Sequence, residues 1–292
     1  MQNDLFADLD AHTSDDSDII KAPFGYTGGK SRSIKNIIRY LPYTDKYISV
    51  FGGSGTDILA RHRVKLEVFN DKYSGLIAFY RCIRDKKRME ELVTRLEYTL
   101  HSREEFEHCK DTWETCDNDV EKAARWYYMI KYSFNSLGRN FGRILKPGTP
   151  LSNKFHNILK EFPAIHERFK YVQIENQDWY DCLIDYDSPN AVFYMDPPYV
   201  NVHSGTYKYD MSIKQHQQML EVISTLEGFV ALSGYPNPLY DEQTFWDDVQ
   251  EWEVLVTSSS GAYNERNHMN GLKHLKNNKS KTVERLWIKE AK

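Results

Sequence analysis

The chain lacks the features of an α-helical membrane protein and of a metal-binding or disulfide-bonded protein. No apolar stretch approaches the roughly 18 residues that a membrane-spanning helix needs, and the N-terminus does not have a signal-peptide pattern. The four cysteines lack CxxC spacing, and the ten histidines show no metal-ligand pattern. We therefore expect a cytoplasmic protein with reduced thiols, no metal and no membrane partner. His203, His216 and His268 are expected on the surface or in loops.

The first twenty residues lack positive charge. Residues 1–20 contain six Asp and no Lys or Arg, and they are polar after Phe6, so they predict a disordered acidic tail. Without this segment the net charge changes from −4 to +2, because six negative charges are removed. A near-neutral body binds DNA when its cations cluster on one face, since phosphate contacts depend on local charge.

A short apolar run at residues 191–195 is followed by Asp196-Pro197-Pro198-Tyr199. Such a run is typical of a buried strand, and the two prolines end it. Asp196 offers a carboxylate acceptor, the prolines offer carbonyls without competing N–H groups, and Tyr199 offers an aromatic face. These groups suit the amine of a nucleobase removed from its stack. A strand-end Asp with a rigid Pro-Pro turn is the alternative that the motif alone leaves open.

A glycine-rich loop lies between a predicted strand at residues 46–51 and a predicted helix at residues 57–63. It consists of Phe51, Gly52, Gly53, Ser54, Gly55 and Thr56. Asp71 ends the next predicted strand, residues 66–69, where a carboxylate suits ribose hydroxyls. Ile58 occupies the third glycine position of a dinucleotide fingerprint, so the loop fits NAD poorly. A tight turn of an α/β fold remains the alternative.

The pattern predicts an α/β protein interrupted by a helical region. We expect a catalytic domain at residues 21–85 and 170–292 and an inserted, mainly helical domain at residues 86–169. A helix at residues 212–226 is predicted to begin at Ser212, and Asp117 or Asp119 is expected to cap a helix of the insertion. Further strands are predicted at residues 171–175, 191–195, 229–233, 252–257 and 283–288.

These motifs, in this order, resemble the Dam-like adenine-N6-specific DNA methyltransferases. The resemblance rests on the Asp-Pro-Pro-Tyr motif, the glycine loop, Gln177-Asp178-Trp179 and the aromatic-x-Gly-Gly-Lys segment from Tyr26 to Lys30. A P-loop needs four residues between its first glycine and the Gly-Lys pair, but only three separate Gly25 from Gly29. The resemblance implies a Rossmann-like sheet with helices on both faces, S-adenosyl-L-methionine as cofactor and double-stranded DNA as partner. It also implies a monomer or weak dimer in a prokaryotic cell or a phage-infected host.

The resemblance assigns the cofactor site to residues from several motifs. Asp178 and Trp179 are expected near the cofactor adenine, although Asp178 also suits a helix N-cap. The predicted cofactor-binding residues are Tyr26, Gly28, Gly29, Lys30, the loop residues Phe51 to Thr56, Asp71, Asp178, Trp179 and Asp196. Ser49 departs from the family, which often has an acidic residue two positions before the loop Phe. That departure leaves open how the methionine ammonium is bound.

The insertion contains a segment that resembles the family's DNA-contacting loop. The predicted DNA-binding residues are Asn135, Arg139, Asn140, Arg143 and Lys146. Arg pairs well with guanine and Asn with adenine, but the arginines equally suit phosphates, and a solvated loop is the alternative.

The resemblance implies that a flipped adenine stacks on Tyr199 while Asp196 and the Pro197 carbonyl accept hydrogen bonds from its amine. The nitrogen then takes the methyl group directly, without a covalent enzyme intermediate. Methylation of cytosine-N4 or RNA adenine, and DNA binding regulated by S-adenosylmethionine without catalysis, remain alternatives. The role as restriction protection, phage anti-restriction or regulation is open.

Overall fold

The computed structural model describes residues 19–26, 28–142, 151–200, 209–256 and 280–292. The described residues form one seven-stranded sheet in the order β3-β2-β1-β4-β5-β7-β6. Strands β1 to β5 run parallel to one another, whereas β7 is antiparallel to both β5 and β6. The strands are β1 (Lys46–Ser49), β2 (Leu66–Asn70), β3 (Gln173–Glu175), β4 (Ala191–Met195), β5 (Phe229–Gly234), β6 (Asp248–Val256) and β7 (Ser280–Lys289).

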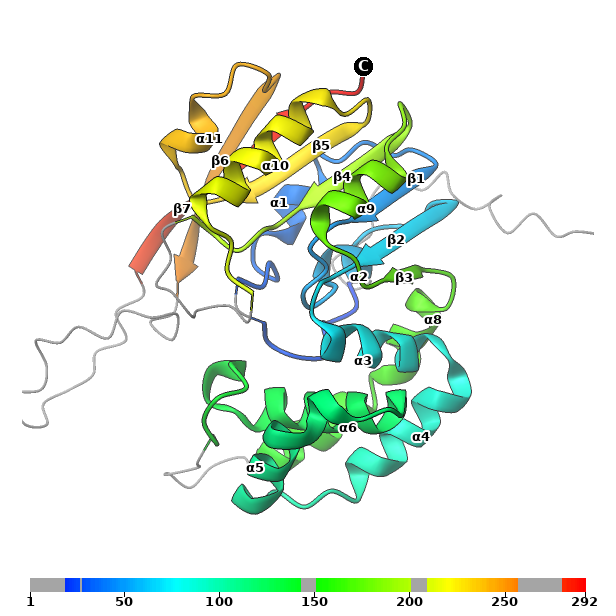
Figure 1. Ribbon diagram of the computed structural model, residues 1–292. Helices are drawn as coiled ribbons and strands as arrows, with labels where there is room; N and C mark the ends of the chain where they lie inside the picture. Colours follow the sequence, from blue (N-terminus) through cyan, green and yellow to red (C-terminus); the bar gives the residue numbers. More distant parts are fainter. Residues whose placement is uncertain (1–18, 27, 143–150, 201–208, 257–279) are drawn as a thin grey trace, which may run out of the picture.

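Helices cover both faces of the sheet and also form a separate layer at one end of it (Figure 1). The helices next to the sheet are α1 (Ile34–Ile38), α2 (Thr56–Ala60), α3 (Ser74–Arg84), α9 (Trp179–Tyr186), α10 (Ile213–Thr225) and α11 (Pro238–Asp241). The helical layer holds α4 (Lys86–Glu97), α5 (Arg103–Thr112), η1 (Trp113–Thr115), α6 (Asp119–Tyr132), η2 (Phe134–Ser136), α7 (Leu151–Leu159) and α8 (Phe162–Phe169).

Strand β4 shows why the sheet needs helices on both sides. All five of its side chains are buried, as expected for a parallel strand covered on both faces. Because successive side chains point to opposite faces, Val192 and Tyr194 pack into one core, whereas Phe193 and Met195 pack into the other. The predicted α/β class, with helices on both faces of the sheet, is therefore confirmed.

The helical layer shares one of these two cores. Helix α3 lies between the sheet and α6, and the ring of Phe79 on α3 stacks on Tyr127 of α6 at 4.9 Å. Phe24, which precedes the Gly-Gly-Lys segment, meets Trp126 edge to face at 5.2 Å. Aromatic pairs of this kind add to the free energy gained by burying their surface. The helical layer is thus packed directly against the part of the chain that leads into the Gly-Gly-Lys segment.

Two local predictions were wrong. Helix α6 is capped by Asn118, not by Asp117 or Asp119, because the Asn118 side chain accepts hydrogen bonds from the first free backbone N–H groups. His216 is fully buried, since it lies on the same face of α10 as the core residues Met219 and Ile223. Its Nδ1 lies 2.7 Å from the Tyr240 hydroxyl, and burial lowers the pKa of His216 to about 4.

Other predictions of helices and strands are confirmed, and some predictions concern residues outside the described ranges. Ser212 caps α10 with a capping box, as expected, and the predicted strands are present with shifted ends. Residues 1–18 of the predicted tail, as well as His203 and His268, lie outside the described residues.

Candidate active site

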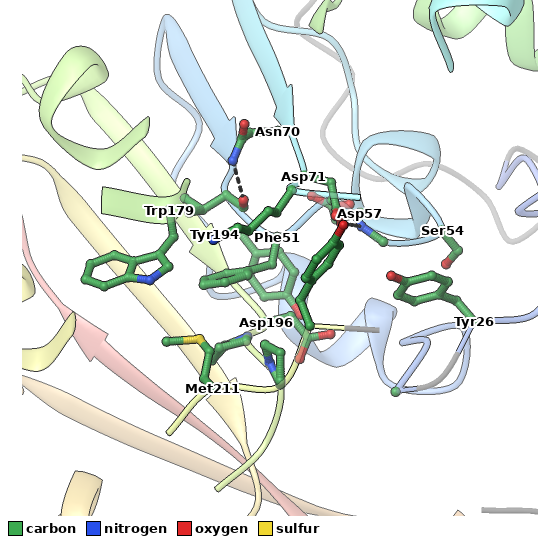
Figure 2. A pocket seen from close by; sticks show the side chains of 18 of the residues that line it. Tyr26, Phe51, Ser54, Asp57, Asn70, Asp71, Trp179, Tyr194, Asp196 and Met211 are labelled. Atoms are coloured by element: carbon green, nitrogen blue, oxygen red, sulfur yellow. Dashed lines mark hydrogen bonds between the residues drawn. The ribbon is translucent and has the colours of Figure 1, made fainter. Parts of the chain in front are cut away.

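The loops that follow β1, β2, β3 and β4 meet at one edge of the sheet. In parallel sheets the carboxyl ends of the strands share an edge. The order of the strands along the sheet reverses between β1 and β4, and such a reversal opens a crevice at that edge. A pocket of about 1050 Å³, which includes space open to solvent, lies at this edge. Figure 2 shows Phe51, Trp179 and Met211 on one side of it, with Tyr26, Ser54 and Asp57 on the other.

Most of the predicted cofactor and catalytic residues line this pocket. They are Tyr26, Gly28, Gly29, Lys30, Phe51, Gly52, Gly53, Ser54, Thr56, Asp71, Asp178, Trp179, Asp196, Pro197 and Pro198. Gly55 and Tyr199 do not line the pocket. Gly55 precedes α2 as its N-cap, and the Tyr199 hydroxyl accepts a hydrogen bond from Lys30, which does line the pocket.

The glycine loop turns tightly enough to bring its backbone to the pocket. The Gly52 N–H donates to the carbonyl of Asn70 at 2.7 Å, and Gly55 donates back to Gly52 at 2.9 Å. A Cβ at Gly52 would lie 2.4 Å from the ring of Phe69, so no larger residue fits there. Gly55 has φ of 67°, in the left-handed region that glycine adopts without strain. The backbone of the loop therefore lines the pocket directly before α2.

Asp71 is held in place by backbone donors. Its two oxygens accept hydrogen bonds from the N–H groups of Gly53, at 2.9 Å, and Tyr73, at 2.8 Å. Burial raises the pKa of Asp71 above its ordinary value, and these backbone hydrogen bonds offset part of the rise. A carboxylate oxygen accepts more than one hydrogen bond, so Asp71 retains capacity toward hydroxyl groups in the pocket.

Asp178 serves as a helix cap and also lines the pocket. Its side chain accepts a hydrogen bond from the Tyr180 N–H at 3.2 Å, at the start of α9, and pairs with Lys72 at 2.7 Å. Trp179 is buried and also faces the pocket. The two interpretations of Asp178 therefore do not exclude each other.

Lys30 joins three parts of the chain at the other end of the pocket. Lys30 is 5% exposed, and its ammonium donates to Asp196 Oδ1 and to the Tyr199 hydroxyl, both at 2.5 Å. Glu284 on β7 lies 3.3 Å from the same ammonium, and its Oε1 accepts a hydrogen bond from Tyr199 at 3.2 Å. Ser33 donates to the second oxygen of Glu284. Lys30 is thus fixed against Asp196 by a buried network.

This network sets the charges around Asp196. Burial raises the pKa of the Asp196 carboxyl above its ordinary value, and the charge of Lys30 offsets part of that rise. Burial by itself lowers the pKa of the Lys30 ammonium, but the charges of Asp196 and Glu284 outweigh it, so that pKa lies above its ordinary value. Ser233 on β5 also donates to Asp196 Oδ1, at 3.1 Å. The described residues give Asp196 Oδ2 no hydrogen bond.

Several residues of the site were not predicted from the sequence, and four of them make contacts that shape it. Asn70 ends β2 and links two loops by donating to the Val50 carbonyl and accepting from the Gln177 N–H, both at 2.9 Å. Its position at a strand end is a signal that sequence reasoning could have used. Ser233 and Glu284 gave no such signal, because their contacts depend on how distant segments pack. Asp57 directly follows the glycine loop, and that position is a signal that could have been used.

The three predicted DNA-binding residues within the described ranges do not line the pocket. Asn135, Arg139 and Asn140 are exposed in a turn closed by a bridge between Ser133 and Phe141. Asn135 has φ of 55°, an uncommon value for a residue other than glycine. The other two predicted DNA-binding residues, Arg143 and Lys146, lie outside the described residues.

The described residues contain neither a candidate metal cluster nor a membrane-spanning helix. No group of three or more His, Cys, Asp or Glu side chains there is arranged to hold a metal ion. None of the described helices is both long enough and apolar enough to cross a bilayer.

Comparisons with known proteins agree with the geometry of the pocket. A family model described as D12 class N6 adenine-specific DNA methyltransferase matches residues 26–244. The chain is 24% identical over 277 residues to Type II methyltransferase M1.LlaDCHI of Lactococcus lactis subsp. cremoris, covering 81% of this chain and 88% of that protein. It is also 24% identical over 220 residues to the DNA adenine methylase of Salmonella typhi, covering 69% and 74%.

A third relative is much longer than this chain. Modification methylase LlaI of Lactococcus lactis subsp. lactis is 23% identical over 201 residues, which are 63% of this chain and 30% of that protein. The family match includes the Gly-Gly-Lys segment, the glycine loop and Asp-Pro-Pro-Tyr, and it spans more than half of the chain. The chain therefore belongs to the D12 class N6 adenine-specific DNA methyltransferases, which act on DNA and require a methyl donor.

Proposed function

We propose that the protein transfers a methyl group from S-adenosyl-L-methionine to the N6 amine of a flipped adenine in double-stranded DNA. The observation that carries the proposal is the position of Asp196 at the pocket edge, with Oδ1 bonded to Lys30 and Ser233 and Oδ2 given no hydrogen bond by the described residues. A carboxylate oriented in this way is prepared to accept a hydrogen bond from an incoming amine.

The pocket residues fit the proposed methyl donor. The backbone of the glycine loop lines the pocket, Asp71 retains acceptor capacity for ribose hydroxyls, and Phe51 and Trp179 offer apolar surface to an adenine. When bound, S-adenosylmethionine supplies an electrophilic methyl group. The residues that would hold it are those of the glycine loop together with Asp71, Asp178 and Trp179.

Asp196 and Pro197 act on the target amine in this proposal. Their oxygens accept its hydrogen bonds, which raises electron density on the nitrogen and orients its lone pair. Tyr199 supplies the stacking face, and its hydroxyl is held by Lys30 and Glu284. No cysteine lines the pocket, so direct transfer without a covalent enzyme intermediate fits the site.

The DNA contacts are proposed for the exposed turn of the helical layer. Arg139 offers a donor pair for guanine or phosphate, and Asn135 and Asn140 offer amides for base edges. We further propose that the protein works in the cytoplasm, because its four cysteines are free thiols.

Sequencing that detects modified bases tests the proposal. DNA from cells that express the protein is compared with DNA from cells that express Asp196→Ala, with Asp45→Ala as a matched control at an exposed surface ion pair. We expect N6-methyladenine at one recurrent motif with the wild type and the control, and none with Asp196→Ala. Full methylation by Asp196→Ala would contradict the assigned role, and methylcytosine in place of methyladenine would contradict the target.

A further inference from the structure

Asp57 is a buried carboxylate in the pocket wall that the mechanism above does not use. It lies in the first turn of α2, directly after the glycine loop, and it is 4% exposed. Its Oδ2 accepts a hydrogen bond from the Tyr47 hydroxyl at 2.8 Å. Figure 2 shows it on the polar side of the pocket, opposite Trp179.

Asp57 has no positive partner among the described residues, unlike the other carboxylates of equal burial. Glu67 and Glu284 are also 4% exposed, and each pairs with a cation, Arg168 at 2.5 Å and Lys30 at 3.3 Å. The described residues provide no ion pair for Asp57. Arg61 stacks instead on the Tyr47 ring, with its guanidinium carbon 4.1 Å from the ring centre. A buried carboxylate without a positive partner is costly unless another group supplies the charge.

The groups around Asp57 favour its ionised form without neutralising it. Burial raises the pKa of Asp57, whereas Ser49, Tyr47 and backbone N–H groups act to lower it. Ser49 is fully buried, and its hydroxyl makes no hydrogen bond of ordinary length among the described residues. It lies close enough to Asp57 to favour the charged carboxylate. The pocket wall therefore contains a buried carboxylate whose described neighbours are hydroxyl and backbone N–H groups rather than a cation.

We propose that Asp57 binds the ammonium group at the amino-acid end of the methyl donor. This inference rests on the proposed function, because it assigns a subsite to the same cofactor. A primary ammonium supplies the missing positive charge, and a charge-assisted hydrogen bond to a carboxylate is strong in a pocket of low polarity. The family often has an acidic residue at the position of Ser49 on β1. In this proposal Asp57 on α2 supplies that carboxylate instead.

Calorimetric binding of two ligands tests this assignment. The ligands are S-adenosylhomocysteine and its deaminated analogue, which keeps the carboxylate and lacks only the ammonium. We expect wild-type protein to bind S-adenosylhomocysteine at least about tenfold more tightly than the analogue. Asp57→Asn should remove that difference by weakening S-adenosylhomocysteine alone, while the affinity for the analogue stays within about twofold. Retained binding of the analogue also shows that the variant is folded.

Three results would overturn the inference. Equal wild-type affinities for both ligands would mean that the ammonium is not recognised, and this result does not depend on the folding of a variant. An equal loss for both ligands in Asp57→Asn would mean that Asp57 only shapes the loop. Wild-type protein that binds neither ligand would overturn the proposed methyl donor itself, a failure visible before any variant is made.

Discussion

The two ends of the pocket balance the charge of a carboxylate in different ways. At the Asp196 end the protein supplies the positive charge itself, because the Lys30 ammonium lies 2.5 Å from Oδ1. At the glycine-loop end the described residues give Asp57 hydroxyl neighbours and no ion pair. The first end is complete before any ligand binds, whereas the second becomes electrically balanced only with a cationic ligand. Under the proposed function, this difference separates a carboxylate that acts in the reaction from one that captures the cofactor.

The largest effect is expected from removing the positive charge at the Asp196 end. Lys30→Met leaves Asp196 and Glu284 without their shared cation, so the rate of methyl transfer should fall by about 100-fold near neutral pH. The lysine holds down the pKa of Asp196, so that pKa rises further without it. The loss should therefore be greatest at low pH and should shrink as pH rises.

Steady-state methyl transfer to DNA across a pH series measures this effect. Lys65→Met is the matched control, because Lys65 forms an exposed ion pair with Asp45 and should leave the profile unchanged. A Lys30→Met profile that is lowered equally at every pH would show that Lys30 does not tune the ionisation of Asp196.

A smaller loss is expected from Glu284→Gln. Glu284 positions Lys30 and the Tyr199 hydroxyl, so its replacement should lower the rate by about tenfold. Its negative charge raises the pKa of Asp196, so the acid limb of the pH profile should move to lower pH, opposite to Lys30→Met. The same kinetic series measures the shift, with Glu253→Gln on the exposed surface of β6 as control. A shift in the same direction as that of Lys30→Met would refute the positioning role.

The smallest effect concerns stability at the glycine-loop end. The pKa of Asp57 is raised in the folded protein, so its contribution to stability is present at low pH and is lost as pH rises through that pKa. Without ligand, Asp57→Asn should therefore raise the melting temperature at pH 7 by roughly 2–4 °C, equivalent to about 1 kcal/mol. The gain should shrink toward acid pH, as measured by calorimetric melting beside an Asp45→Asn control. A lowered melting temperature at pH 7 would contradict the absence of a positive partner.

The sequence predicted the parts of the site that carry local signals. Asp196, Asp71 and Asp178 each follow a predicted strand, and parallel strands bring such positions to one edge. The contacts of Glu284 and Ser233 were not predictable, because they depend on β5 and β7 pairing beside β4. For Tyr199 the motif was evident from the sequence, but the hydrogen bonds that its hydroxyl makes with Lys30 and Glu284 were not.

Transfer of an isotopically labelled methyl group tests the central claim most directly. Purified protein is incubated with duplex DNA and S-adenosylmethionine that carries a deuterated methyl group, and the digested nucleosides are analysed by mass spectrometry. We predict label on N6-methyl-2′-deoxyadenosine with the wild type and none with Asp196→Ala. Label on cytosine, or bound S-adenosylmethionine with no label on adenine, would contradict the account.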